Sequence, residues 1–206
     1  MKPAVVDYYF TPQSPWAYLG HARFMALLGR HGATAIVKPV NLNRVFAVSG
    51  GLPLLQRPAQ RQAYRLIELE RFRRHLNVPL NLHPRHFPVV PDQASCLLIA
   101  VDQRHGAEQA MALQSAIGAA VWSEEKNIAD TPTLIELANQ QELDGAALVE
   151  AAADASVMRR YDELTDEAIA RGVFGAPTYV LDGEPFWGQD RLALLEEAML
   201  RRRGAP

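Results

Sequence analysis

Residues 14–17, Ser-Pro-Trp-Ala, combine a hydroxyl group with the pattern of a helix start. Serine is a favoured N-cap residue and proline is favoured at the first helical position, so a helix is predicted to begin here. A helix start presents unpaired N–H groups and a partial positive charge, and this environment lowers the pKa of a thiol. The segment has no cysteine, but the Ser14 hydroxyl can donate a hydrogen bond to a thiolate that another molecule brings. The alternative is that Ser14 only caps the helix.

A second segment, residues 172–178, places Pro177 after a helix-ending glycine and before a strand pattern. This position is compatible with a cis peptide bond between Ala176 and Pro177. An ordinary turn is the alternative for this segment taken alone.

A third segment, residues 186–191, leads into the last helix pattern of the chain. Gly188 lets a backbone or a ligand approach closely, because it has no side chain. Asp190 can accept hydrogen bonds from a ligand ammonium group while nearby N–H groups hold a ligand carboxylate. The simpler alternative is that Asp190 is an N-cap.

Strand and helix patterns at both ends of the chain position these three segments. Residues 4–10 and 34–40 read as strands on either side of the first helix, which favours a parallel pair with a right-handed crossover. Residues 178–181 and 184–187 read as a hairpin around Asp182-Gly183, and an amphipathic helix follows over 189–203.

The middle of the chain, residues 58–171, shows almost only helical periodicity. In its first helix the side chains of Tyr64, Ile67, Phe72 and Leu76 lie close to one face. We therefore predict an α/β fold, with a thioredoxin-like domain over 1–57 and 172–206 and a helical insertion domain over 58–171. A loop is predicted over 77–92, and further helices are predicted over 93–106, 108–122, 132–139, 146–156 and 157–171.

Composition narrows the classes of partner. The formal net charge of −2 over 206 residues argues against nucleic acid, because phosphate binding needs a basic face. Cys96 is the single cysteine, so the chain has no intrachain disulfide and no cysteine cluster for a metal, and we interpret it as a small buried residue on a helix. The apolar run 94–101 is too short to span a bilayer, and no secretory signal pattern opens the chain. We expect a cytoplasmic protein without a membrane segment or a metal.

The order and spacing of the three segments resemble the 2-hydroxychromene-2-carboxylate isomerases. These enzymes belong with the kappa-class glutathione transferases in the DsbA-like branch of the thioredoxin fold. The resemblance rests on residues 8–20, the helix around 64–71, residues 172–178 and residues 187–191, and it covers nearly the whole chain. It implies a DsbA/kappa-GST type domain with a large all-helical insertion, a glutathione cofactor and a homodimer.

Site residues are carried over from this resemblance by position. Ser14 matches the serine that faces the glutathione sulfur, and Ala176 matches the residue before the cis proline, Pro177, that pairs with the glutathione backbone. Glu68 stands where kappa-class relatives have an aspartate near the γ-glutamyl end, although an exposed helix face explains it equally well. The segment that holds the γ-glutamyl end is matched by Trp187, Gly188, Gln189 and Asp190.

The substrate side departs from the family pattern. Related isomerases carry a lysine near the position of Phe46 or Ala47, but this chain has no lysine between Lys38 and Lys126. Arg57 is the candidate cation for a carboxylate substrate, and His86 falls near a family aromatic residue that contacts substrate. A surface position is the alternative for both.

The resemblance implies a glutathione-dependent isomerase that interconverts 2-hydroxychromene-2-carboxylate-like hemiketals and trans-o-hydroxybenzylidenepyruvate-like unsaturated 2-oxo acids. Its partner would be a small aromatic or unsaturated oxo-acid substrate. One alternative is a kappa-class-like glutathione transferase or peroxidase, which consumes the thiol. Another is a non-catalytic module that binds glutathione or a peptide.

Overall fold

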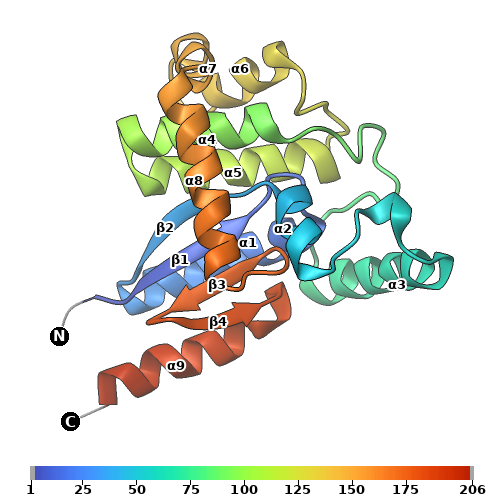
Figure 1. The fold of residues 1–206 in the computed structure, drawn as a ribbon, viewed down its shortest axis with the longest axis vertical. Helices are drawn as coiled ribbons and strands as arrows, with labels where there is room; N and C mark the ends of the chain where they lie inside the picture. The colour runs from blue at the N-terminus through green and yellow to red at the C-terminus, as the bar shows by residue number, and fades with distance from the viewer. Residues whose placement is uncertain (1–2, 205–206) are drawn as a thin grey trace.

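The β-branched and aromatic run near the start of the chain forms β1 (Val5–Phe10), around which the sheet is built. The structure, a computed structural model, describes residues 3–204. The strand β1 pairs in parallel with β2 (Thr34–Pro39) and antiparallel with β3 (Thr178–Leu181), which pairs antiparallel with β4 (Glu184–Trp187). The strand order β2-β1-β3-β4 confirms the predicted mixed α/β fold (Figure 1).

Helices cover both faces of this sheet, because neighbouring side chains of a strand point to opposite sides. The Tyr8 ring packs against Phe24 of α1 (Pro15–His31), with ring centroids 5.0 Å apart. The Tyr9 hydroxyl donates to Glu167 of α8 (Ala155–Ala170) at 2.9 Å, on the other face. The crossover helix α1 therefore lies on one face and α8 on the other.

The closing segment returns to the face of α1. It begins with a single 3-10 turn, η2 (Gln189–Arg191), and continues as α9 (Leu192–Gly204), which packs on α1 and β3. The sequence pattern predicts one continuous helix from Gln189. The tighter first turn follows Gly188, whose φ of +107° is a conformation that favours glycine.

Most of the helical middle of the chain lies above the sheet in Figure 1, but the helix over residues 59–76 lies beside the sheet and α8 runs down across it. The centre of this helical middle is the apolar run 94–101, every residue of which is buried. Cys96 in this run is buried as predicted, and burial, with the charges of Asp92 and Asp162, raises the pKa of its thiol to about 11. Its further helices are α3 (Ala59–Leu76), α4 (Asp92–His105), α5 (Ala107–Trp122), α6 (Thr131–Asn139) and α7 (Gly145–Ala152).

Two features of the segment after β2 differ from the prediction. A short helix, α2 (Leu42–Ser49), forms where none was predicted, because the Asn41 side chain caps its first N–H groups. A 3-10 turn, η1 (Leu54–Gln56), follows it. In α3, Phe72 and Leu76 of the predicted face pack against the core, but Tyr64 and Ile67 are exposed and Leu69 is buried in their place.

The domain division at residues 57/58 and 171/172 remains a prediction, and residues 1, 2, 205 and 206 lie outside the described part. Among residues 3–204, no helix is both long and apolar enough to cross a membrane.

Candidate functional site

The first component of the candidate site is the N-terminus of α1. The Ser14 hydroxyl oxygen accepts a hydrogen bond from the backbone N–H of Ala17 at 3.2 Å, which confirms Ser14 as the N-cap. The residue is only 6% exposed. The first turn of α1 contains Pro15 and no acidic side chain, so the partial positive charge of the helix start is not neutralised from within this turn.

The second component is the loop before β3, which meets Ser14 in space. The Ser14 Oγ lies 3.5 Å from the carbonyl oxygen of Ala176, and the Ala176–Pro177 peptide bond is cis. The Thr178 hydroxyl donates to the Gly175 carbonyl at 2.8 Å. Within residues 3–204, no hydrogen bond takes the N–H of Ala176. The Ala176 carbonyl accepts from the Ser14 hydroxyl, and the Ala176 N–H is free to pair with an extended peptide beside that hydroxyl.

The third component, residues 187–190, is tied to this loop by a backbone hydrogen bond. The Gly188 N–H donates to the Pro177 carbonyl at 2.9 Å. Gly188, rather than Asp190, is the N-cap residue of η2, so the simple capping role for Asp190 is wrong. The Asp190 carboxylate pairs with Arg191 at 3.1 Å and remains 43% exposed, so it is accessible to a ligand.

Gln189 is placed differently from Asp190. It is buried, and its side chain and its carbonyl both accept hydrogen bonds from the Arg23 guanidinium of α1. Its side chain therefore fixes the η2 turn against α1, and its N–H at the start of the turn is the group it can offer a ligand. Burial lowers the pKa of Arg23, while the charge of Asp190 opposes that shift. Sequence reasoning missed Arg23, because its partner is 166 positions away.

Trp187 is half-exposed beside the cis-proline loop. Its indole packs over Gly175 and meets the Phe174 ring edge-on, with centroids 4.7 Å apart. A side chain on Gly175 would collide with the indole nitrogen. The indole thus forms one apolar edge of the loop that carries Ala176.

Glu68 is less closely linked to this group. Its carboxylate, largely buried, pairs with Arg71 at 2.6 Å on the same helix, α3. No hydrogen bond or ion pair among the described residues connects it to residues 187–190. Its role at the γ-glutamyl end stays a prediction.

The two substrate residues expected from the sequence lie on other elements. The Arg57 Nε donates to the Leu52 carbonyl at 2.8 Å, and its guanidinium carbon is 5.9 Å from the centroid of the Phe46 ring. The fold therefore brings the Arg57 cation to Phe46, where the resemblance expects a lysine. Burial, and then the charge of Arg61, lower the pKa of Arg57.

His86 is half-buried in the loop between α3 and α4. The next residue, Phe87, packs on Trp122 with ring centroids 4.7 Å apart. The Trp122 Nε1 donates to the carbonyl of Gln13 at 3.2 Å, directly before Ser14. The loop of His86 therefore flanks the start of α1.

Lys38 does not serve this site. Its ammonium group is buried and pairs with Asp7 at 2.8 Å and Glu167 at 2.7 Å, on the face of the sheet that α8 covers. These two ion pairs neutralise its charge, so Lys38 is not the cation of the candidate site.

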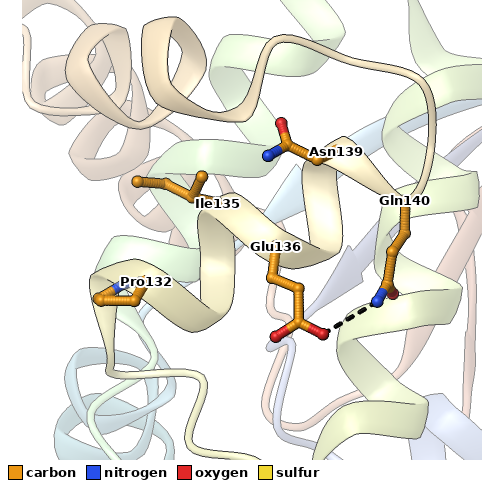
Figure 2. Close-up of a pocket in the computed structure, with 5 residues that line it drawn as sticks. All are labelled: Pro132, Ile135, Glu136, Asn139 and Gln140. Carbon is orange, nitrogen blue, oxygen red and sulfur yellow. Dashed lines mark hydrogen bonds between the residues drawn. The ribbon is translucent and has the colours of Figure 1, made fainter.

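Two other features carry no argument for this site. Among the described residues, no group of three or more His, Cys, Asp or Glu side chains is arranged to hold a metal ion. Figure 2 shows the residues that line a hollow on α6, all from this helix except its C-cap residue Gln140, which donates a hydrogen bond to Glu136. In Figure 1, α6 lies at the opposite end of the molecule from β4.

Comparison with known proteins identifies the family and supports the fold. The sequence model of the DSBA-like thioredoxin domain matches residues 5–200. A 2-hydroxychromene-2-carboxylate isomerase of Pseudomonas putida is 31% identical over 202 residues, with 96% of this chain and 95% of that protein aligned. One of Sphingobium xenophagum is 29% identical, with 95% and 97% aligned. A solved structure of a 2-hydroxychromene-2-carboxylate isomerase superposes with a TM-score of 0.79 at 30% identity, covering 96% of this chain and 95% of that one.

Proposed function

Because the chain belongs to the DSBA-like thioredoxin domain family and, within it, to the 2-hydroxychromene-2-carboxylate isomerases, we propose that it is a glutathione-dependent isomerase. Its substrates are 2-hydroxychromene-2-carboxylate-like hemiketals and trans-o-hydroxybenzylidenepyruvate-like unsaturated 2-oxo acids. The observation that carries the proposal is the meeting of the Ser14 hydroxyl, at a helix N-terminus, with the backbone of Ala176, whose N–H takes part in no hydrogen bond among residues 3–204.

The chain supplies no thiol of its own to this place. Its single cysteine, Cys96, is buried in α4, and its thiol has a pKa raised to about 11. A site that favours a thiolate, but contains none, fits a small thiol that arrives as a ligand.

The residues around Ser14 fit glutathione group by group. The Ala176 N–H and carbonyl pair with the cysteinyl backbone, as an added strand would. At the γ-glutamyl end, Asp190 accepts from the ammonium group, and the first N–H groups of η2 hold the carboxylate. Trp187 packs against the same end. Glu68 adds a second carboxylate if α3 approaches that end when the ligand binds.

The chemistry can be divided between the cofactor and the chain. When bound, glutathione would supply a thiolate for reversible addition to an electron-poor carbon and elimination from it, so that the intervening bond can rotate and the thiol is recovered. Ser14 would donate a hydrogen bond from its hydroxyl to the thiolate sulfur, and the N-terminus of α1 would stabilise the negative charge. Arg57 and His86 contact the substrate, and Arg57 supplies a cation in place of the missing lysine.

A thiol-dependence assay tests the proposal. Purified protein is mixed with 2-hydroxychromene-2-carboxylate, with and without glutathione, and the isomer is followed by absorbance. We expect turnover only with glutathione and no loss of free thiol after many turnovers. Stoichiometric loss of thiol selects the kappa-class-like transferase or peroxidase, and glutathione binding without turnover selects the non-catalytic module.

Two further parts of the proposal concern the protein as a whole. We place it in the cytoplasm, where reduced glutathione is the main thiol buffer. We also propose a homodimer, which light scattering at the protein concentration of the assay tests directly.

A further inference from the structure

Arg65, on the inner face of α3, is a largely buried cation without an acidic partner in residues 3–204. Its guanidinium carbon lies 5.1 Å from the centroid of the Phe87 ring and 5.7 Å from that of Trp122. One of its terminal nitrogens is buried with no hydrogen-bond partner. Arginine is rarely buried unless it is paired, because an unmet charged donor is costly. This group is therefore placed to bind a ligand that accepts hydrogen bonds.

The surroundings of Arg65 are positive. Burial and the charge of Arg57 lower the pKa of Arg65 to about 10, so it stays protonated at neutral pH. Arg61 lies one turn earlier on the same helix and adds a further positive charge. The carboxylates of α3 are already used, since Glu68 pairs with Arg71, and Glu70 pairs with Arg73 and Arg74. The arginines 57, 61 and 65 thus form a cluster without a counter-ion in the described chain.

The cluster lies beside the start of α1. Trp122, under the Arg65 guanidinium, donates from its indole to the Gln13 carbonyl, and the Gln13 side chain accepts from the Val89 N–H at 3.0 Å. Two turns along the same face of α3, Phe72 meets Trp16 in the first turn of α1, with ring centroids 6.0 Å apart. The contacts of Trp122 with Gln13 and of Phe72 with Trp16 therefore hold this face of α3 next to Ser14.

We propose that Arg65 binds the carboxylate of the oxo-acid substrate at the Ser14 site, an inference that rests on the proposed function. A guanidinium fits a carboxylate with two parallel hydrogen bonds. The aromatic rings of Phe87 and Trp122 hold the guanidinium in place and offer an apolar surface to an aromatic substrate.

The position of Arg65 favours the substrate carboxylate over the glycine carboxylate of glutathione. Arg65 packs on Phe87, the neighbour of His86, and the charge of Arg57 acts on it, so it is linked to both predicted substrate residues. Apart from Glu68 on α3, the residues predicted to hold glutathione come from the start of α1, the cis-proline loop and residues 187–190. Separate binding measurements for the two ligands distinguish these two sources of carboxylate.

The kinetic test compares Arg65→Gln and Arg65→Lys with Arg74→Gln, an exposed arginine on the same helix that serves as the control. For Arg65→Gln we expect KM for 2-hydroxychromene-2-carboxylate to rise about tenfold or more, the usual loss for a hydrogen-bonded charged group. In the same variant, KM for glutathione should change by less than about twofold. For Arg65→Lys we expect a KM between those of the wild type and Arg65→Gln, because lysine keeps the positive charge but cannot make the two parallel hydrogen bonds of a guanidinium.

A binding test is independent of turnover. Isothermal titration uses phenylpyruvate as the carboxylate probe, 1-phenylpropan-2-one as its neutral counterpart, and glutathione. We expect Arg65→Gln to weaken phenylpyruvate binding about tenfold while leaving the neutral ketone and glutathione unchanged. Circular dichroism shows whether each variant is folded, and Arg65→Lys provides the measurement if Arg65→Gln is not.

The two hypotheses fail in different ways. The wild type could bind phenylpyruvate through Arg65 and yet lack isomerase activity. That result would support the carboxylate site and contradict the proposed reaction. The carboxylate site is overturned if the wild type does not bind phenylpyruvate, or if the wild type and Arg65→Gln bind it equally. It is also overturned if Arg65→Gln weakens the binding of glutathione alone.

Discussion

The Ser14 Oγ lies 3.5 Å from the carbonyl oxygen of Ala176, although 162 positions separate the two residues in the chain. The sheet brings them together. β1 ends at Phe10, shortly before Ser14, and its antiparallel partner β3 begins at Thr178, shortly after Ala176. Because Tyr9 pairs with Thr178, the loop after β1 and the loop before β3 leave the sheet at the same end.

Replacement of Ser14 by alanine tests the hydroxyl at this junction. We expect kcat/KM to fall about 10²- to 10³-fold, the usual result of losing one preorganised donor to a developing anion. The loss of the N-cap should also lower the free energy of unfolding by about 1 kcal/mol. Steady-state kinetics at saturating glutathione and urea unfolding measure the two effects.

Two controls separate capping from chemistry. Asp144→Ala removes the cap of α7, which accepts from Ala147 at 3.1 Å, so it should cost similar stability without reducing activity. Ser14→Asp should keep the cap but repel a thiolate, so the variant should fold and be inactive. Full activity in Ser14→Asp would contradict a thiolate at this position.

Asp190→Asn tests the predicted hydrogen bond between the Asp190 carboxylate and the γ-glutamyl ammonium group. We expect KM for glutathione to rise about tenfold, because a charged hydrogen bond is lost at a half-exposed site, while kcat at saturating glutathione is retained. Asp162→Asn is the matched control, since Asp162 is an exposed aspartate paired with Arg44 at 2.8 Å, on the α8 face. An equal rise in both variants would show that general charge, rather than a specific contact, is responsible.

Gly20→Ala and Gly29→Ala should change stability in opposite directions, although both residues lie in α1. A Cβ on Gly20 would lie 2.7 Å from the Cβ of Gln189, so η2 must shift, and we expect a loss of about 1–3 kcal/mol. A Cβ on Gly29 meets nothing within 4 Å, and alanine favours the helix by about 0.5–1 kcal/mol. Urea unfolding of both variants measures the difference.

The Gly20 variant also has a functional consequence. Because η2 carries Asp190, a displaced turn should weaken glutathione binding in Gly20→Ala and leave it unchanged in Gly29→Ala. Unaltered titration curves for both variants would mean that η2 takes no part in the cofactor site.

His21 should make stability depend on pH in the mildly acidic range. Burial lowers the pKa of its ring to about 4, although a hydrogen bond to the Met111 carbonyl at 2.8 Å acts in the other direction. The unfolded chain takes up a proton near pH 6.5, and the folded chain does not until about pH 4. The stability present above pH 6.5 should therefore decline as pH falls, by about 2 kcal/mol at pH 5.

Urea unfolding at pH 7.5 and pH 5 checks this decline. In His21→Gln, which retains a donor for the Met111 carbonyl, the decline should be smaller by about the same 2 kcal/mol. The exposed His105→Gln should behave like the wild type. Identical pH dependence in all three proteins would place the acid sensitivity elsewhere.

The sequence alone determined the features that depend on near neighbours. The β-branched run of β1, the Ser-Pro start of α1 and the hairpin turn at Asp182 were predictable, because each is a local preference of a few residues. The presence of a single cysteine already excluded a dithiol centre. Two local features were not predicted. The first is α2, whose signal is one capping asparagine, and the second is the 3-10 turn before the last helix, which depends on the backbone of Gly188.

Only the tertiary structure decided which distant residues meet. Pairing of β1 with β3 brings Ala176 to Ser14, and packing of α1 on η2 turns Gln189 toward Arg23 and leaves Asp190 exposed. It also placed Arg65 inside and Tyr64 outside, against the apolar pattern of α3, because Phe87 and Trp122 from other segments cover the guanidinium. Such contacts join residues through packing at long range, which helical or strand periodicity in one segment does not encode.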